Sequence, residues 1–445
     1  MTTPPASDRT ARPSVLIFFT HLYPYAKGEE FIEIELPHLA RAWDRVIVVA
    51  TKTRDGDEVT RQVPEGVTVL RAGRQLDDGR LSELRAAARG VRAAVANSSS
   101  PAALLGRKLD LLRQTGGHPM KVAMELAFVG VADEVTTDLV AQLRDHWDDW
   151  DLGRAEIDLY AYWLHSSATA LLGTAAWLRS RGATVGAKVA RGHRYEIFRE
   201  IATLGHLPQR PQLLAGLDGV YVVSEMGARR VRDENPGFAG KVHCQHLGTR
   251  DPGPVLSLGR EPFTVVSCAL MTPVKRLDRI PGIVRRLRDR GIDARWTHIG
   301  SGPEEDAVRA LGRDLLGEHA SFPGYVPNAD LVDFYRRLNP SVLVNLSSSE
   351  GLPVNLMDGA SLGLPLVATN VGGCAEIVHN RDNGFLLDAD FTDDDAVAAL
   401  TVLATEPDEA YRARGARSRQ LWAEGFDEAV VYPQFIEQVR ALAAR

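Results

Sequence analysis

The residues best suited to chemistry lie in the run 347–360, SSSEGLPVNLMDGA. Glu350 precedes a predicted helix, and Asp358 lies more than one turn into that helix. Both carboxylates would project toward one crevice, where they could accept hydrogen bonds from the adjacent hydroxyls of a sugar or ribose ring. The backbone N–H groups of Gly351 and Leu352 could face a phosphate there. Taken singly, however, the two acids are better explained as a helix cap and a solvated helix residue.

Two glycine-containing loops also follow predicted strands. Gly28 leads into an amphipathic helix, so backbone N–H groups could approach an anion there. The alternative is that Glu29 and Glu30 simply complement the helix dipole. Gly300 and Gly302 follow a later strand, but the third glycine of a dinucleotide fingerprint is missing and the P-loop pattern is absent. The sequence therefore gives little support to NAD binding or ATP hydrolysis.

Short β-branched runs alternate with helical stretches and would position these loops. The strands expected in the first half are residues 15–19, 45–50, 67–71, 157–163, 187–190 and 219–223. Those expected in the second half are residues 263–268, 294–299, 321–325, 341–346, 365–369 and 385–387. Such a pattern is typical of parallel sheets covered by helices on both faces. Ligands bind outside the carboxyl ends of such strands, so we expect two doubly wound α/β domains with sites at those ends.

The expected domain bounds follow from composition. Residues 1–14 are rich in Pro, Thr and Ala and would form a flexible tail, and residues 251–262 are dense in Gly and Pro and would form a linker. An N-terminal domain would occupy residues 15–250 and a C-terminal domain residues 263–425. A final helix over residues 426–445 would pack back on the N-terminal domain.

Residues 81–146 differ from the rest because they predict helices without a strand. The cations of their first part are Arg85, Arg89, Arg92, Arg107, Lys108 and Arg113, against Glu83 and Asp110. A basic amphipathic surface could make peripheral contact with an anionic membrane. A solvated helical insertion is the simpler interpretation.

Composition excludes several classes of protein. The 445 residues are 44% hydrophobic and 25% charged, as in a globular protein rather than a disordered one. A formal charge of −6 gives no general attraction to nucleic acid. Three dispersed cysteines are too few for a disulfide framework or a zinc cluster, and no apolar run is long enough for a membrane span or a secretory signal. We expect a soluble, cytoplasmic protein.

The run from Glu350 through Gly372-Gly373 to residues 383–385 resembles the donor-site signature of family-4 retaining glycosyltransferases of the GT-B fold. That signature has two glutamates with seven intervening residues, and here Asp358 takes the second place. Similarity continues at residues 273–278, 300–303, 324–326, 23–35, 160–163 and 191–196. It covers nearly the whole chain outside 81–146 and looks closest to members that build bacterial surface polysaccharides. The resemblance implies two Rossmann-like domains facing across a cleft.

By this resemblance, the C-terminal domain binds the donor. Lys275 would neutralise its diphosphate and act in catalysis, with backbone groups around Gly28 assisting. Family members often have an arginine at the position of Leu270. Arg276 would partly replace this missing cation. Glu350 would hold the donor sugar as a second catalytic residue, and Asp358 would hold the ribose. The remaining implied donor contacts are Gly302, Tyr325, Val326, Gly351 and Leu352.

The same resemblance implies that the N-terminal domain binds the acceptor. His193 matches the family histidine near the reacting carbon and would be catalytic. Arg194 stands where a glycine is common in the family, and this added cation suggests an anionic acceptor. Glu196 and His21 complete the implied acceptor site.

The implied activity is transfer of a sugar, with retention of configuration, from a nucleotide-diphosphate sugar to a hydroxyl. The acceptor would be a glycan, a lipid-linked saccharide or a small molecule, and neither cofactor nor catalytic metal is expected. Two alternatives stay open: a degenerate, non-catalytic partner subunit, favoured by Asp358 and Leu270, and a sugar-nucleotide epimerase.

Overall fold

The computed structural model describes residues 12–25, 29–54, 56–73, 80–96 and 101–443. The chain divides into two compact units. The first unit comprises the residues up to Val223, residues 227–245, and those from Tyr432 onward, and the second comprises residues 224–226 and 246–431. Most of the tail expected at residues 1–14 lies outside the described residues, and the linker expected at 251–262 falls within the second unit.

The first unit is built on a seven-stranded sheet with the order β3-β2-β1-β4-β5-β6-β7. The strands pair in parallel throughout. Their bounds are β1 Ser14–Thr20, β2 Arg45–Ala50, β3 Val67–Arg71, β4 Glu156–Ala161, β5 Thr184–Gly192, β6 Gly219–Val222 and β7 Val242–Cys244. The first six confirm the predicted strands, and β7 is an edge strand that the sequence reading missed.

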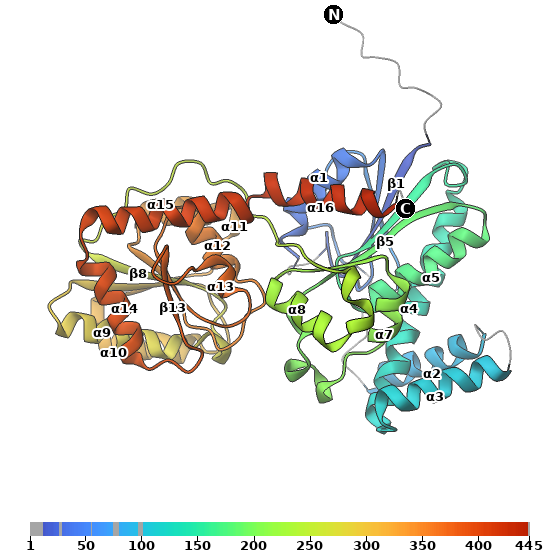
Figure 1. Ribbon diagram of the computed structural model, residues 1–445, viewed down its shortest axis with the longest axis horizontal. Helices are drawn as coiled ribbons and strands as arrows, with labels where there is room; N and C mark the ends of the chain where they lie inside the picture. Colours follow the sequence, from blue (N-terminus) through green and yellow to red (C-terminus); the bar gives the residue numbers. More distant parts are fainter. Residues whose placement is uncertain (1–11, 26–28, 55, 74–79, 97–100, 444–445) are drawn as a thin grey trace, which may run out of the picture. The chain divides into compact units, whose positions relative to one another are not determined.

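Helices cover both faces of this sheet (Figure 1). One face packs against α1 and α16 through a core that includes Leu36 and Phe435, and the other packs against α4, α5, α7 and α8. The helices of this unit are α1 Ile32–Ala42, α2 Arg80–Ala96, α3 Pro101–Thr115, α4 Pro119–Asp145, α5 Ser166–Ser180, α6 Arg194–Ile197, α7 Arg210–Gly216, α8 Glu225–Glu234 and α16 Glu428–Ala443. Short 3-10 turns are η1 Arg199–Ile201, η2 Thr203–Gly205 and η3 Pro236–Lys241.

The second unit has a six-stranded parallel sheet with the order β10-β9-β8-β11-β12-β13. Its strands are β8 Phe263–Cys268, β9 Ala294–Ile299, β10 Ala320–Gly324, β11 Val342–Asn345, β12 Leu366–Thr369 and β13 Gly384–Leu387, and they confirm the predicted set. Its helices are α9 Ile280–Asp289, α10 Glu305–Leu316, α11 Asn328–Leu338, α12 Val354–Ser361, α13 Cys374–Ile377, α14 Asp393–Thr405 and α15 Asp408–Gly425. The 3-10 turns are η4 Pro273–Lys275, η5 Leu277–Arg279 and η6 Gly317–His319.

Residues 81–146 form the three helices α2, α3 and α4, and α2 and α3 lie beside α4 in Figure 1. Arg89 pairs with Glu134 of α4 at 2.8 Å, so one of the cations noted in the sequence is used within the segment. The side chain of Arg107 lies outside the described residues. No helix in the described part of the chain is both long and apolar enough to cross a membrane.

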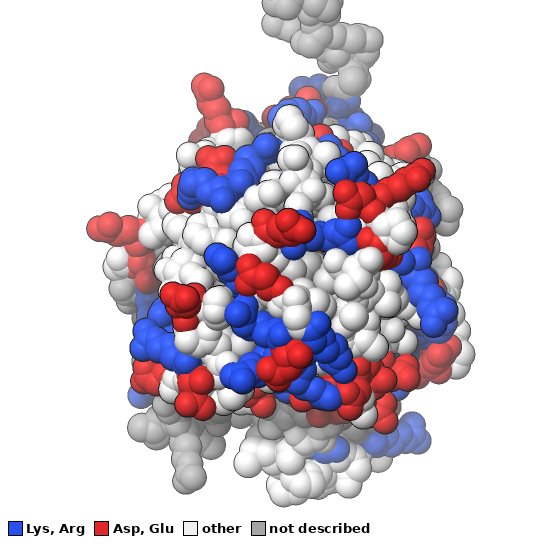
Figure 2. All heavy atoms as spheres, turned by 90° about the vertical axis from the view of Figure 1, so that its left-hand side faces the viewer, with Lys and Arg blue, Asp and Glu red and all other residues white. Residues whose placement is uncertain are grey.

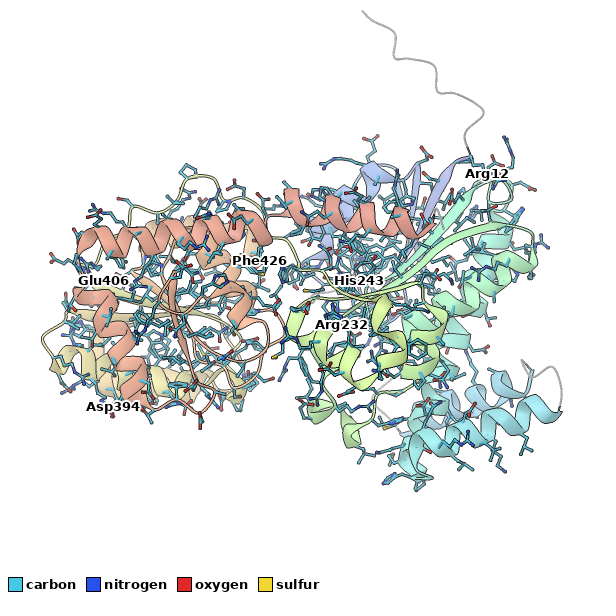
Figure 3. All side chains as sticks on the ribbon, viewed as in Figure 1. Arg12, Arg232, His243, Asp394, Glu406 and Phe426 are labelled. Carbon is cyan, nitrogen blue, oxygen red and sulfur yellow. The ribbon has the colours of Figure 1, made fainter. Side chains whose placement is uncertain are left out.

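Charge is evenly mixed on the face of the second unit in Figure 2, where acidic and basic side chains intermingle. Asp394, near the start of α14, pairs with Arg286, and Glu406, just after that helix, accepts a 2.9 Å hydrogen bond from Arg414; both acids are labelled in Figure 3. Opposite charges therefore neutralise one another locally, and this face has no broad basic surface among the described residues.

Candidate functional site

The residues predicted to bind a donor lie where loops follow the strands of the second sheet. Lys275 ends the turn after β8, and Glu350 lies in the loop between β11 and α12. The Lys275 ammonium donates to Oε1 of Glu350 at 2.7 Å, and their side chains are 23% and 10% exposed. An ammonium has three donors and this contact uses one, so Lys275 keeps capacity for an anion.

Asn345 holds the Glu350 carboxylate in place and was not singled out from the sequence. Its side-chain N–H group donates to Oε1 of Glu350 at 3.1 Å and to Oδ1 of Asn355 at 3.1 Å. Asn355 in turn donates to the carbonyl of Cys268 at 2.9 Å. A polar residue ending the apolar strand β11 was the available signal, because side chains at the carboxyl end of a parallel strand face the ligand edge.

The loop after β12 packs on the backbone of this site. Gly372 has a φ of 57°, and a Cβ there would lie 2.1 Å from the carbonyl oxygen of Glu350. Gly373 donates its N–H to the carbonyl of Gly351 at 2.7 Å. The glycine pair noted in the sequence thus allows two loops to touch and fixes the backbone beside Glu350. Leu352 is buried next to Gly373.

Asp358 lies in the second turn of α12, which begins at Val354 with Pro353 at the N-cap rather than in the first helical position. Its side-chain carboxylate has no hydrogen-bond or ion-pair partner among the described residues. Burial raises the pKa of Asp358 to about 7. Its charge acts in turn on Cys268 and Tyr335, whose pKa values are raised chiefly by their own burial and further by Asp358. A carboxylate that is desolvated and lacks a protein partner is suited to accept hydrogen bonds from a ligand.

Other predicted donor contacts surround this edge. Gly302 follows β9 with a φ of 155°, and a Cβ there would lie 2.6 Å from the carbonyl oxygen of Met271. Arg276 donates to the carbonyl of Ala389 at 2.9 Å, which commits one nitrogen of its guanidinium to the protein. Tyr325 is 61% exposed after β10, and Val326 is half-buried. Leu270, in place of the family arginine, is 60% exposed.

In the first unit, aromatic rings gather at the carboxyl ends of β1, β4 and β5. Trp163 lies between two predicted site residues, with ring centroids 5.2 Å from His21 and 4.3 Å from His193. Both ring nitrogens of His193 are buried without a hydrogen-bond partner among the described residues, and Nδ1 lies 3.4 Å from Oε2 of Glu196. Burial lowers the pKa of His21 well below its usual value, and nearby Lys52 adds to that shift.

The other predicted residues of the first unit differ in their contacts and burial. Oε2 of Glu196 accepts the backbone N–H of His193 at 2.8 Å, while Oε1 is buried without a partner in the described part of the chain. Arg194 is half-buried. Gly28 lies outside the described residues. Glu29 does not simply complement the helix dipole, because its carboxylate accepts the backbone N–H groups of His21, Leu22 and Tyr23 at 2.6–2.9 Å.

A cavity of about 1070 Å³ opens beside these residues in the first unit. Its wall combines one face of α4 with loops that follow β4 and β5, and it includes Tyr195 and Glu196 but not Arg194. Two cations that sequence reasoning missed, Lys52 and Arg210, also line it. Lys52 follows β2, so its place at a strand end was the available signal; Arg210 begins α7 and carried no such signal.

Some of the motif residues in the first half are structural. Arg191 and Glu35 are fully buried and joined by a 2.8 Å ion pair. Tyr160 donates to the same carboxylate at 3.0 Å and accepts from Nε of Arg191 at 2.7 Å. These three residues join α1, β4 and β5 behind the site, so they support it rather than face a ligand.

Part of this chain is similar in sequence to known glycosyltransferases. The family model described as glycosyl transferases group 1 matches residues 255–420. The putative colanic acid biosynthesis glycosyltransferase WcaL of Escherichia coli is 29% identical over 48% of this chain and 54% of its own length. The amylovoran biosynthesis glycosyltransferase AmsK of Erwinia amylovora is 23% identical over 60% of this chain and 67% of its own length. The chain thus matches only about half of WcaL.

Solved structures cover nearly the whole chain. Anabaena Alr3699/HepE, solved with UDP and glucose, aligns with a TM-score of 0.60 at 14% identity over 96% of this chain and 99% of its own. The lipopolysaccharide outer core galactosyltransferase WaaB aligns with a TM-score of 0.63 at 11% identity over 96% and 99%. At such identities the likeness concerns the fold alone, and it confirms the predicted fold class.

Proposed function

We propose that this chain, whose residues 255–420 match the group 1 family of glycosyltransferases and which has the GT-B fold, transfers a sugar from a nucleoside-diphosphate sugar to an acceptor hydroxyl with retention of configuration. The observation that carries the proposal is the pairing of Lys275 with Glu350 at the carboxyl edge of the second sheet. The Asp358 carboxylate, which has no partner among the described residues, belongs to the same edge, because Asp358 and Lys275 both act on the pKa of Cys268 at the end of β8. This set offers a cation and two carboxylates to one diphosphate sugar.

Each group has a defined task in this reaction. Lys275 binds the diphosphate and stabilises the negative charge that grows on it as the bond to the sugar breaks. Glu350 turns Oε2, which has no partner among the described residues, to the sugar hydroxyls, while Oε1 stays bound to Lys275 and Asn345. Asp358 accepts from the ribose hydroxyls. The leaving phosphate deprotonates the acceptor on the same face of the sugar, so no protein nucleophile is needed.

The acceptor belongs to the first unit in this proposal. Among the described residues, the ring nitrogens of His193 and Oε1 of Glu196 have no hydrogen-bond partner. Either can hydrogen-bond the attacking hydroxyl. The donor is a UDP-sugar, by likeness to the neighbour solved with UDP and glucose. We also propose a cytoplasmic location, where the three cysteines would stay free thiols.

A donor panel tests the proposal. The protein is incubated with UDP-glucose, UDP-galactose, UDP-N-acetylglucosamine and GDP-mannose, with and without octyl glucoside, and nucleoside diphosphate is measured. We expect release that rises with acceptor and is lost in Glu350→Gln, whereas Glu318→Gln, an exposed glutamate of the same unit, stays active. An altered nucleotide sugar without acceptor would indicate an epimerase instead. Donor binding without release from any of the four would indicate a non-catalytic subunit.

A further inference from the structure

The cavity of the first unit is apolar along one wall and charged along the other. The apolar wall is the face of α4 that carries Met124, Ala127 and Phe128, joined by Ile201 and Leu207 from the loop after α6. At about 1070 Å³ the cavity is at the upper end of the range of roughly 300–1,000 Å³ found for small-molecule sites. Met120 and Ile201 are 56% and 38% exposed there, an arrangement that favours an apolar ligand.

The charged wall carries two cations whose hydrogen-bonding capacity is largely unused. Arg210 is 4% exposed, and its Nε and Nη1 atoms have no partner among the described residues; Nη2 donates to the carbonyl of Glu196. Burial lowers the pKa of Lys52 to about 8, which nearby Glu196 only partly offsets. His165 lines the cavity together with both cations. Burial also lowers the pKa of His165 well below its usual value, and Lys52 and Arg210 add to that shift.

A buried guanidinium with two unsatisfied nitrogens is costly unless a ligand completes its hydrogen bonds. Carboxylates and phosphates match the planar fork of arginine. We propose that this cavity binds an amphiphilic acceptor, with its apolar chain along α4 and an anionic group, such as a phosphate, against Arg210 and Lys52. The acceptor hydroxyl then lies toward Glu196, whose Oε1 is free, and His193. That this ligand is the acceptor rests on the proposed function, but its binding to the cavity does not.

Alkyl phosphates below their micellar concentration test this assignment by calorimetric titration. Hexyl, octyl and decyl phosphate should bind progressively more tightly, by up to about fourfold per methylene. Decyl glucoside, with the same chain and a neutral head, should bind at least tenfold more weakly than decyl phosphate. Equal affinity for inorganic phosphate and decyl phosphate would overturn the apolar part of the proposal.

Matched variants locate the site. Ala127→Phe fills the cavity and should weaken decyl phosphate at least tenfold, whereas Ala141→Phe, exposed on the same helix away from the cavity, should not. Lys52→Met should weaken decyl phosphate about tenfold and leave decyl glucoside unchanged. Lys108→Met, an exposed lysine of α3, should have no effect, because adsorption to the basic helices is not the binding mode. Equal binding by Ala127→Phe and wild type would overturn the proposal.

A second experiment distinguishes a membrane lipid from a soluble amphiphile. Phosphatidic acid in phosphatidylcholine vesicles replaces decyl phosphate. Vesicle binding that is lost in Ala127→Phe supports a membrane source, whereas tight binding of the monomer alone supports a soluble one. UDP titration of every variant shows whether the second unit is intact. If UDP binding and donor turnover are normal while decyl phosphate does not bind, only this inference is contradicted. If decyl phosphate binds as expected while no donor is used, only the proposed function falls.

Discussion

In the proposed mechanism, Lys275 is the residue on which the chemistry depends most directly. Lys275→Ala removes a cation that would stabilise charge on the departing diphosphate. Losing one hydrogen bond to a charged group costs about 1.5–3 kcal/mol, which corresponds to roughly 10- to 150-fold in turnover if the bond acts in the transition state. We expect a loss in that range at saturating donor, measured as the rate of nucleoside diphosphate release.

The control for Lys275→Ala must separate chemistry from folding, because the substitution also leaves the buried Glu350 without its ion-pair partner. Arg290→Ala removes an exposed cation of the same unit and should leave turnover unchanged. Turnover of Lys275→Ala within twofold of wild type, with an unaltered melting temperature, would exclude the catalytic role.

The two carboxylates should differ in what they recognise. Asp358→Asn keeps the size but removes the charge, so it should weaken UDP and UDP-sugar alike. Glu350→Gln should weaken the UDP-sugar and spare UDP, because the proposed contact of its Oε2 atom is with the sugar. Calorimetric titration of both ligands against both variants measures this. Unchanged UDP affinity in Asp358→Asn would remove the ribose contact and favour a degenerate subunit.

The pKa of about 7 for Asp358 gives this contact a pH dependence. The carboxylate is the better acceptor, so UDP affinity should fall as pH drops from 8 to 6, and Asp358→Asn should lose that component. The free energy of unfolding depends on pH in the opposite direction. A carboxyl group whose pKa is raised in the folded state binds its proton more tightly there than in the unfolded chain. The stability that this proton contributes is therefore lost as pH rises through the folded pKa of about 7. Asp358→Asn should therefore unfold at higher urea than wild type at pH 8.

At the scale of single residues, sequence reasoning found those that stand in a recognisable local pattern. Glu350 and Asp358 share one loop and helix, and Lys275 follows a strand. Asn345 was missed although its place at the end of β11 was an available signal. Arg210 was missed because its significance comes from a contact with the Glu196 carbonyl, 14 residues away, which no local spacing reveals. The roles of the predicted site residues stay predictions until the variants are measured.

At the scale of elements, the buried pair of Glu35 and Arg191 ties α1 to β5. Arg191→Met leaves a buried carboxylate uncompensated, which costs about 3–5 kcal/mol. The double variant Glu35→Leu with Arg191→Met removes both charges and should recover much of that loss. Urea denaturation measures both. Arg154→Met, which breaks the exposed pair with Asp151, should change stability by less than about 0.5 kcal/mol. A double variant no more stable than Arg191→Met would contradict this account.

Elements with a continuous apolar run were predictable to within a few residues. β2 and β8 have the predicted bounds, because both are β-branched runs buried on two faces. The edge strand β7 was missed because Val242–Cys244 is short and carries a histidine. Near the site, the helix predicted after Glu350 is α12, which begins at Val354 with Pro353 as its N-cap.

At the scale of the whole molecule, donor binding should appear as thermal stabilisation. A ligand at about 100 times its dissociation constant stabilises the folded state by about 2.7 kcal/mol. We expect UDP to raise the melting temperature of wild type and much less that of Asp358→Asn, in a scanning fluorimetry experiment. Inorganic diphosphate, which lacks the nucleoside, serves as the matched ligand control. An equal shift from UDP and diphosphate would mean that the ribose and base contribute nothing.

The course of the chain through α16 has a consequence for synthesis on the ribosome. Phe435 is fully buried in the first unit, against Tyr160 and Tyr221, yet it is translated after every residue of the second unit. While the ribosome finishes the chain, the earlier sheet therefore lacks part of its cover, and its apolar face stays open to chaperones. A premature stop codon before Tyr432 would spare the later-made unit and damage the one made first.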